Sequence, residues 1–298
     1  MAKTIGAKIA KLFSILVAAA VLFTCTLMFA ACESKYPEIE MKISFNGETY
    51  TLTYKLYRSP YEQTVEHYLE LIDMGYFDNT VIHDYQDDRM VGGGYTYEDI
   101  ENGDITDDLT ALNYYAATHN EDGSVKIPVS VWKDSASTQA TNRLYGEIES
   151  NGFRTNFSGV ENQTGAIGTY SYVSGNEKSS VYVKRTNDPD GERAEREYYN
   201  NSVTSMFYLA TGSSAASDSS FCVFGELANS DSVTAFSDLT TAISDYITAQ
   251  QESNDSYSFT ETVEKTIEDD MASESQYDVT FNVPKVKIVI SSVEVTKY

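Results

Sequence analysis

Cysteine and histidine are scarce in this 298-residue sequence, and each shortage excludes a class of site. Of the three cysteines, Cys25 and Cys32 lie in or just after an apolar segment near the start. Only Cys222 remains in the body, so the body cannot form an intramolecular disulfide. The three histidines are scattered and make no zinc motif, and no glycine loop of the phosphate-binding kind is present. We therefore expect no cofactor and no metal site.

Basic residues are also few, 21 against 45 acidic ones. Three of them (Lys3, Lys8 and Lys11) precede the apolar segment, whereas every acidic residue follows Cys32. The rest of the chain is therefore more acidic than the whole. Such a charge repels nucleic acid and anionic lipid headgroups, so we expect no nucleic-acid partner.

The N-terminus has the layout of an export signal. Basic residues precede an apolar run over residues 12–31, and two alanines stand directly before Cys32. This arrangement resembles a bacterial lipobox, with Phe29 where leucine is more usual. It predicts that residues 1–31 are removed and that Cys32 becomes the lipidated first residue of an extracytoplasmic protein anchored to the cell membrane. An uncleaved spanning anchor is the alternative, because about 20 apolar residues can also cross a bilayer.

The body carries patterns of both strands and helices. Residues 41–57 alternate polar and apolar positions around Asn46 and Gly47, which predicts a β-hairpin. Residues 64–75 have helical periodicity, with Thr64 as the expected cap and Gly75 at the end. A second amphipathic helix is expected over 238–247, and a closing strand over 283–295.

The body is expected to be one domain, residues 41–298, after a spacer over 32–40. Two polar, acidic segments, near 98–143 and 249–278, have no sustained periodicity. We interpret them as insertions into this domain.

Several motifs of the body occur in a recognisable order: TVEHYLELIDMGYFDNTVIH, YGEIESNGF, RTNDPD, SMFYL, CVFGEL and PKVKIVISSVEV. Their order and most of their spacing resemble those of the cyclophilin-type peptidyl-prolyl cis-trans isomerases. The resemblance implies a mainly β fold, an eight-stranded closed antiparallel barrel capped by two helices, and this agrees with the patterns above. It also implies proline-containing peptides or exported proteins as partners.

The catalytic segment of the family departs from its pattern here. The family lowers the barrier of about 20 kcal/mol to X-Pro rotation by placing an arginine where it favours a pyramidal prolyl nitrogen. VIHDYQDDRMVGGGY aligns without a gap with the family pattern F-H-R-V-I-P-G-F-M-I-Q-G-G-D. The histidine falls on His83, which the family uses structurally, and the arginine falls on Asp84. A negative charge at this position disfavours the polarisation that catalysis requires.

Other substrate-binding positions of the family are partly retained. The resemblance puts the pocket methionine on Met90 and the aromatic floor on Tyr208. Met206 stands where the family has glutamine, and Phe221 stands where it has a distal histidine. These four residues are the predicted peptide-binding set.

Two positions stay open. Arg89 stands in place of a pocket phenylalanine and is a possible substitute for the lost arginine. The alternative is a solvated arginine paired with Asp87 or Asp88. The strand that lines the groove is ambiguous too, because one motif aligns Tyr170 with the family's small alanine and another aligns Lys184.

These observations predict a membrane-tethered extracytoplasmic cyclophilin-like protein, by family a peptidyl-prolyl isomerase that assists folding of exported proteins, with low activity. The alternative is a non-catalytic peptide- or protein-binding module, in which Met90, Tyr208 and Phe221 belong to the binding surface. A surface antigen or scaffold without a peptide groove is a third possibility.

Overall fold

The computed structural model describes the chain in stretches: residues 34–101, 109–112, 147, 162–170, 179–184, 193–198, 205–212, 221–268 and 276–298. The predicted signal segment and Cys32 lie outside them, so cleavage, lipidation and localisation stay predictions. Within these stretches, neither helix is both long and apolar enough to cross a membrane.

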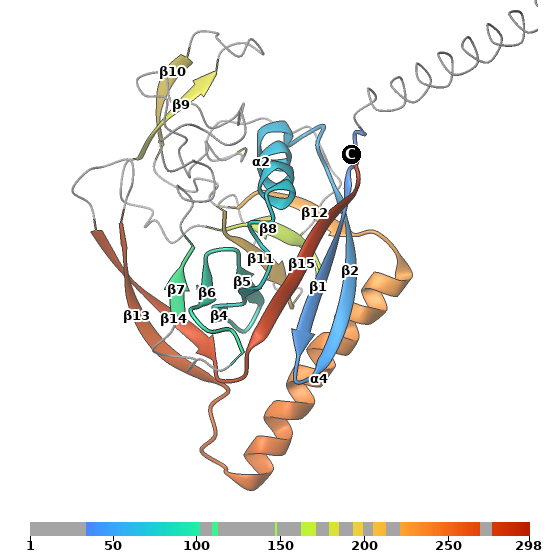
Figure 1. The fold of residues 1–298 in the computed structure, drawn as a ribbon, viewed down its shortest axis with the longest axis vertical. Helices are drawn as coiled ribbons and strands as arrows, with labels where there is room; N and C mark the ends of the chain where they lie inside the picture. Colours follow the sequence, from blue (N-terminus) through green and yellow to red (C-terminus); the bar gives the residue numbers. More distant parts are fainter. Residues whose placement is uncertain are drawn as a thin grey trace, which may run out of the picture.

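One large curled sheet dominates the described residues (Figure 1). All its neighbouring strands are antiparallel, in the order β3-β15-β1-β2-β12-β8-β11-β5-β4. The strands are β1 (Glu38–Phe45), β2 (Glu48–Leu56), β3 (Thr80–Val81), β4 (Asp84–Tyr85), β5 (Arg89–Gly92), β8 (Ile167–Thr169), β11 (Phe207–Ala210), β12 (Val223–Leu227) and β15 (Ile288–Lys297).

The two edge strands of this sheet, β3 and β4, are pieces of one short segment. Between them, the Ile82 N–H donates to the carbonyl of Ile288 at 2.9 Å, and the His83 N–H donates to the carbonyl of Val91 at 3.0 Å. The sheet therefore curls until both edges reach this segment. The mainly β fold is confirmed as a curled half-barrel of nine strands, whereas the closed eight-stranded barrel is not confirmed.

The first hairpin follows the sequence pattern closely. β1 pairs with β2 in continuous register, from Glu38 opposite Lys55 to Phe45 opposite Glu48. Asn46 and Gly47 adopt positive φ angles of 49° and 88°. Two successive left-handed residues suit the twist of a tight hairpin, which explains the Asn-Gly pair.

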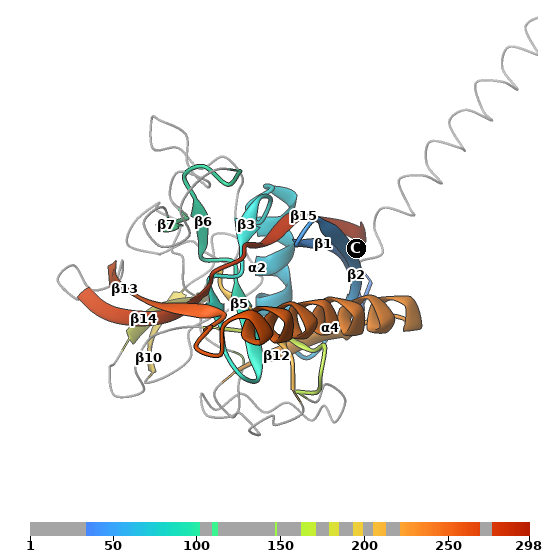
Figure 2. The same cartoon turned by 90° about the horizontal axis from the view of Figure 1, so that it is seen from below.

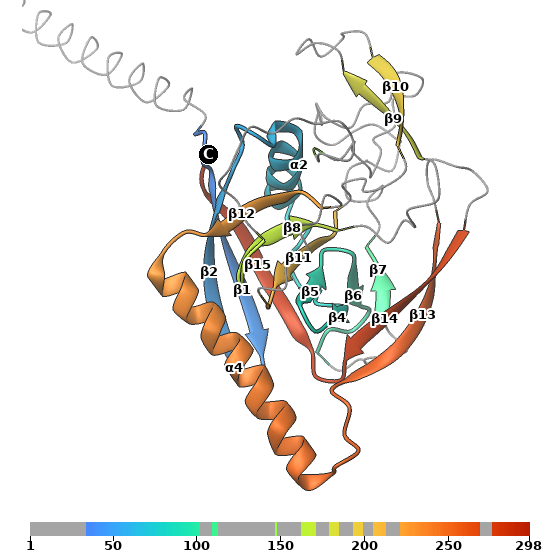
Figure 3. The same ribbon diagram turned by 180° about the vertical axis from the view of Figure 1, so that it is seen from behind.

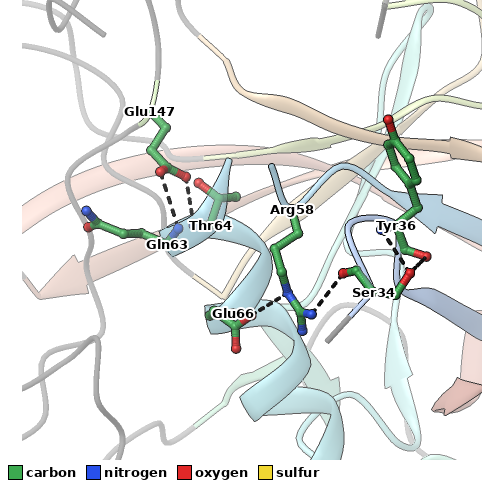
Figure 4. Close-up of polar contacts among 7 residues, drawn as sticks. All are labelled: Ser34, Tyr36, Arg58, Gln63, Thr64, Glu66 and Glu147. Carbon is green, nitrogen blue, oxygen red and sulfur yellow. Dashed lines mark hydrogen bonds and ion pairs between the residues drawn. The ribbon is translucent and has the colours of Figure 1, made fainter. Parts of the chain in front are cut away.

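The first helix, α2 (Glu62–Asp73), begins earlier than predicted, and Thr64 is not its cap. The Glu147 carboxylate accepts hydrogen bonds from the backbone N–H groups of Gln63 (3.2 Å) and Thr64 (2.9 Å), as Figure 4 shows. A distant carboxylate thus satisfies the free N–H groups of the first turn, in place of a local side chain. The helix ends as predicted, with Gly75 at a φ of 66°.

The second helix, α4 (Ser230–Ser253), is longer than the predicted span of 238–247. Asn229 caps it, because its side-chain oxygen accepts a hydrogen bond from the Ser232 N–H at 2.8 Å. Phe236, Leu239 and Ile243 are its buried apolar residues. Phe236 extends the apolar spacing of Leu239 and Ile243 toward the N-terminus, outside the predicted span, whereas the last turns after residue 247 are polar.

The interior of the curled sheet is one apolar core to which both helices contribute. Figure 2 shows α4 across the lower end of the sheet, with α2 behind it at the other end. Tyr68 of α2 stacks on Phe224 of β12 with ring centroids 4.5 Å apart. Burial of these large rings supplies much of the driving force that joins helix and sheet.

Three two-stranded sheets complete the described structure: β6 (Tyr95–Tyr97) with β7 (Leu109–Ala111), β9 (Ser179–Lys184) with β10 (Arg193–Tyr198), and β13 (Thr260–Glu268) with β14 (Gln276–Pro284). The β13–β14 pair lies beside the β4–β6 region (Figure 3). A second apolar cluster joins Phe281 and Val283 of β14 to Tyr95, Tyr97 and Leu109. The segment predicted as an insertion near 249–278 thus contains the end of α4 and all of β13.

Candidate active site

The segment that joins β3, β4 and β5 contains the positions aligned with the family's catalytic strands. His83 is fully buried, with its ring against Tyr95 (4.7 Å between centroids) and Phe281 (5.2 Å). Burial lowers its pKa to about 3, although a backbone hydrogen bond with Val81 opposes the shift. The imidazole is therefore neutral at physiological pH and packs inside the protein, which suits the structural role predicted for it.

Asp84, at the family's arginine position, is 1 % exposed and accepts hydrogen bonds from two parts of the chain. Its Oδ1 accepts the backbone N–H of Asn282 in β14 at 2.9 Å, and its Oδ2 accepts the Gln86 side-chain amide at 2.7 Å. A buried carboxylate needs such donors, because desolvation of a charge is costly. Asp84 therefore links the edge of the main sheet to the β13–β14 hairpin.

Arg89 pairs with Ala210 of β11, and paired residues lie on the same face of a sheet. Ala210 and Tyr208 are two residues apart on β11, so Arg89 lies on the same face as Tyr208. Its guanidinium carbon is 5.1 Å from the centre of the Tyr208 ring and 5.3 Å from that of Phe221. Both distances are within the range of cation–π attraction. The side chain is only 12 % exposed, so the structure does not show the solvated arginine of the alternative interpretation.

The guanidinium also makes a two-pronged ion pair with Asp88. Nε and Nη2 donate to the two carboxylate oxygens of Asp88 at 2.8 Å and 2.7 Å. This hydrogen-bonded pair raises the pKa of Arg89 and lowers that of Asp88, so both stay charged over the physiological range. The pairing with Asp88 agrees with one of the two partners expected from the sequence.

Tyr208 and Phe221 meet at the centre of this face, with ring centroids 5.6 Å apart. Tyr170 stacks on Phe221 at 5.4 Å with nearly parallel rings. Tyr208 is 1 % exposed, whereas Tyr170 and Phe221 stay partly exposed. We call Arg89, Tyr170, Tyr208 and Phe221 the aromatic cluster.

Gly168 is the residue beneath the Tyr208 ring. A Cβ added to Gly168 would lie 2.4 Å from two carbons of that ring and 2.6 Å from its hydroxyl oxygen. Only glycine therefore allows Tyr208 to lie flat against β8. The sequence alignments did not identify Gly168. Its pairing with Tyr208 on the neighbouring strand, a small residue beside a large aromatic one, is the pattern that could have identified it.

The structure separates the two predicted methionines. Met90 is fully buried in the interior core, on the face of β5 opposite to Tyr208, because neighbouring residues of a strand point to opposite faces. Val91 packs with Tyr208 instead. Met206 is partly buried, and its Cγ would lie 2.8 Å from a Cβ added to Gly94.

The strand adjacent to the aromatic cluster is β8, which pairs with both β11 and β12. Tyr170 follows β8 directly, and its N–H donates to the carbonyl of Met206 at 3.0 Å. Lys184 lies on β9, which pairs only with β10 among the described strands. Of the two alignments left open by the sequence, the structure therefore favours the one through Tyr170.

A hydrogen-bonded bridge connects the Asp84 side of the site to the aromatic cluster. The Gln86 amide nitrogen that donates to Asp84 also lies 3.1 Å from the hydroxyl of Tyr170. Burial raises the pKa of Tyr170, so its hydroxyl stays protonated. Gln86 and Asn282 are site residues that sequence reasoning did not identify. Gln86 is only two residues from Asp84, whereas the contact of Asn282 with Asp84 depends on how β14 packs.

Cys222 lies next to Phe221 but is buried, and its N–H donates to the Thr169 hydroxyl at 3.1 Å. Burial raises the pKa of its thiol well above the ordinary value. A protonated, buried thiol is a poor nucleophile, so Cys222 belongs to the packing of the site and not to its chemistry.

Comparison with known proteins assigns the family. The sequence model described as "cyclophilin type peptidyl-prolyl cis-trans isomerase/CLD" matches residues 40–256. This chain belongs to the cyclophilin-type peptidyl-prolyl cis-trans isomerase family. The match runs from Glu40 in β1 through β12 and all of α4, and it ends before β13.

Two similar solved structures are of a cyclophilin-type peptidyl-prolyl cis-trans isomerase from Cryptosporidium parvum. The first has a TM-score of 0.38 at 12 % identity, and each comparison covers 88 % of this chain and 99 % of the other. The second, solved in the presence of the dipeptide Ala-Pro, has a TM-score of 0.40 at 11 % identity. These low scores add no weight to the family match, and no curated protein matches the chain.

Proposed function

We propose that this cyclophilin is a membrane-tethered extracytoplasmic protein that engages proline-containing segments of exported proteins and catalyses their isomerisation only weakly. The family supports a peptidyl-prolyl isomerase role. The main support for low activity comes from Asp84, which stands where the family has its arginine. Its buried carboxylate is hydrogen-bonded to Asn282 and Gln86.

The chemical reason is electrostatic. Rotation about an X-Pro bond is easier when the prolyl nitrogen becomes pyramidal and its lone pair accepts a hydrogen bond from a cation. A carboxylate cannot donate that bond, and its charge opposes the polarisation. Loss of one preorganised donor typically costs roughly 10²–10³-fold in turnover, so we expect a loss of at least this order relative to members that retain the arginine.

Arg89 is the candidate source of weak remaining turnover. It lies on the same face as Tyr208, and its Nη1 donates to none of the described residues. The ion pair with Asp88, however, neutralises much of its charge and holds Nε and Nη2. A proline ring can reach Tyr208 only if the side chains over it move, because the Tyr208 residue is almost fully covered; Arg89 and Phe221 are two of its neighbours.

The second candidate function is a non-catalytic binding module, and the aromatic pair Tyr170–Phe221 favours it. Both rings are partly exposed and nearly parallel. Aromatic surfaces bind extended proline-rich segments without any need for bond rotation. This surface can hold a peptide even while Tyr208 stays covered.

One NMR experiment separates the two functions. An Ala-Pro peptide is titrated with the protein, while chemical shifts report binding and exchange spectroscopy reports isomerisation. We expect binding that weakens in Phe221→Ala, together with slow exchange that disappears in Arg89→Ala. Asp87→Asn is the matched control, because Asp87 is exposed and lies next to the site. Binding with no exchange supports the binding module, whereas exchange that is insensitive to Arg89 and Phe221 contradicts the site assignment.

The tether is proposed from the sequence, because Cys32 follows an apolar segment with the layout of an export signal. A Cys32→Ser variant should accumulate unprocessed or be released from the membrane. Fractionation and mass spectrometry of the N-terminal peptide measure both. Normal processing with unchanged membrane retention in Cys32→Ser would contradict lipidation.

A further inference from the structure

The chain just beyond Cys32 is fixed to the folded body at Ser34 (Figure 4). The Ser34 N–H donates to the carbonyl of Tyr298 at 2.8 Å, and the Ser34 carbonyl accepts a hydrogen bond from Arg58 Nη1 at 2.9 Å. Arg58 is itself buried and forms an ion pair with Glu66, with Nε and Oε1 2.6 Å apart. Both backbone groups of Ser34 are therefore engaged by the body.

Only one residue, Glu33, separates Ser34 from Cys32. An extended chain spans at most about 3.6 Å per residue, so the Cα atoms of Cys32 and Ser34 are at most about 7 Å apart. The headgroup layer on each side of a bilayer is about 5–7 Å thick. Acyl chains on Cys32 would therefore bring the surface around Ser34 into contact with the headgroups.

The residues at this surface suit such a contact. Lys35, Tyr36, Thr296, Lys297 and Tyr298 are all exposed, and we call them the anchor-proximal surface. Tyr36 is 39 % exposed and Tyr298 is 53 % exposed, and they are two of the three large hydrophobic residues exposed in the described part of the chain. Tyrosine is enriched where proteins meet the bilayer interface, because its ring is apolar and its hydroxyl is polar.

Two acidic groups near this surface, Glu38 and Asp73, already have partners. Lys297 Nζ lies 2.8 Å from Glu38 Oε1, and the Tyr298 hydroxyl donates to Asp73 Oδ1 at 2.5 Å. A local contact with lipid is thus possible although the whole chain is strongly acidic. Its partner should be the zwitterionic headgroup region, since long-range attraction to anionic lipid is disfavoured.

We propose that the anchor-proximal surface rests on the bilayer to which Cys32 is attached, with Tyr36 and Tyr298 in the headgroup region. This inference rests on the proposed tether and specifies its geometry. β1 leads away from this surface, and α4 ends at the opposite end of the long axis (Figures 1 and 3). The body therefore has a fixed orientation on the membrane, with the end of α4 far from the lipid.

The test uses the lipidated protein in phosphatidylcholine vesicles. An NBD fluorophore is attached through Lys35→Cys or, as the control, through Gln251→Cys at the exposed end of α4. Cys222 is buried and is kept. Dithionite, which stays in the water, destroys accessible NBD. We expect destruction at least several-fold slower at position 35 than at position 251, and equal rates in an unanchored Cys32→Ser protein.

Three outcomes overturn all or part of the inference, and each has a distinct signature. A protein that is lipidated by mass spectrometry but has equal rates at both positions overturns the resting surface and leaves the tether intact. A protein without lipid on Cys32 overturns both. In Tyr36→Ser/Tyr298→Ser the protection at position 35 should be lost, whereas Val233→Ser, which removes an equally exposed apolar residue from α4, should preserve it. Protection that survives loss of both tyrosines overturns their role.

Discussion

Replacement of Asp84 by asparagine should destabilise the protein, because the change acts on a buried and hydrogen-bonded carboxylate. Asparagine can keep an oxygen toward the Asn282 N–H. Its amide nitrogen would then face the Gln86 amide nitrogen, which now donates to Oδ2 at 2.7 Å. Two donors would meet there unless the Gln86 amide turns over, and that turn would change its contact with the Tyr170 hydroxyl.

The magnitude follows from these two contacts. A hydrogen bond to a charged group contributes about 1.5–3 kcal/mol, and a buried donor left without a partner costs about 1–3 kcal/mol. The bond to Asn282 survives in weakened form, so we expect Asp84→Asn to lower the free energy of unfolding by about 2–3 kcal/mol. Asp87→Asn, at an exposed site three residues along, should change it by less than about 0.5 kcal/mol.

Urea denaturation of the purified protein and both variants measures these differences. Circular dichroism follows the sheet, and an unchanged dependence on denaturant shows that the folded and unfolded states remain comparable. If Asp84→Asn is as stable as Asp87→Asn, then Asp84 does not link the sheet to the β13–β14 hairpin, and the explanation of its burial is wrong.

The other predictions concern four further changes. Between pH 6.5 and about 3, His83 binds a proton in the unfolded protein but not in the folded one. This residue should therefore lower the free energy of unfolding by about 1.4 kcal/mol for each pH unit of acidification. A His83→Gln variant measured by pH-dependent denaturation should lack that slope. Gly168→Ala should cost about 1–3 kcal/mol in thermal or urea unfolding, because the new Cβ would overlap the Tyr208 ring. Glu147→Ala should cost about 1–2 kcal/mol, since the first turn of α2 loses its cap, and unchanged stability would contradict that role. Asp84→Arg should lower stability without raising turnover in an exchange assay, because the site is buried against β14.

The local elements were largely predictable from the sequence. The Asn46–Gly47 turn identified the first hairpin, and Gly75 identified the end of α2, because each of these conformations depends on residues next to one another in the chain. The start of α2 was not predictable in this way. Its N-terminal groups bind Glu147, which lies more than 80 residues away in the sequence.

The site was predictable in its position but only partly in its contacts. The alignment placed Asp84, Arg89, Tyr208 and Phe221, and the structure brings the last three together. It could not assign Met90, because side chains alternate across a strand and a match of residue type does not fix the face.

The β13–β14 hairpin could not have been placed from the sequence either, since it lies beyond the family match. The hydrogen bond between Asp84 and Asn282 joins residues 198 positions apart. This contact gives a structural reason for an aspartate at the family's arginine position.

Weak catalysis is tested most directly by the rate of cis-trans exchange of an Ala-Pro peptide, measured by NMR at catalytic amounts of the protein. We predict turnover at least roughly 10²-fold below that of a cyclophilin that retains the arginine, and a further loss in Arg89→Ala. Turnover equal to that of the arginine-containing enzyme, and unchanged by Arg89→Ala, would contradict it.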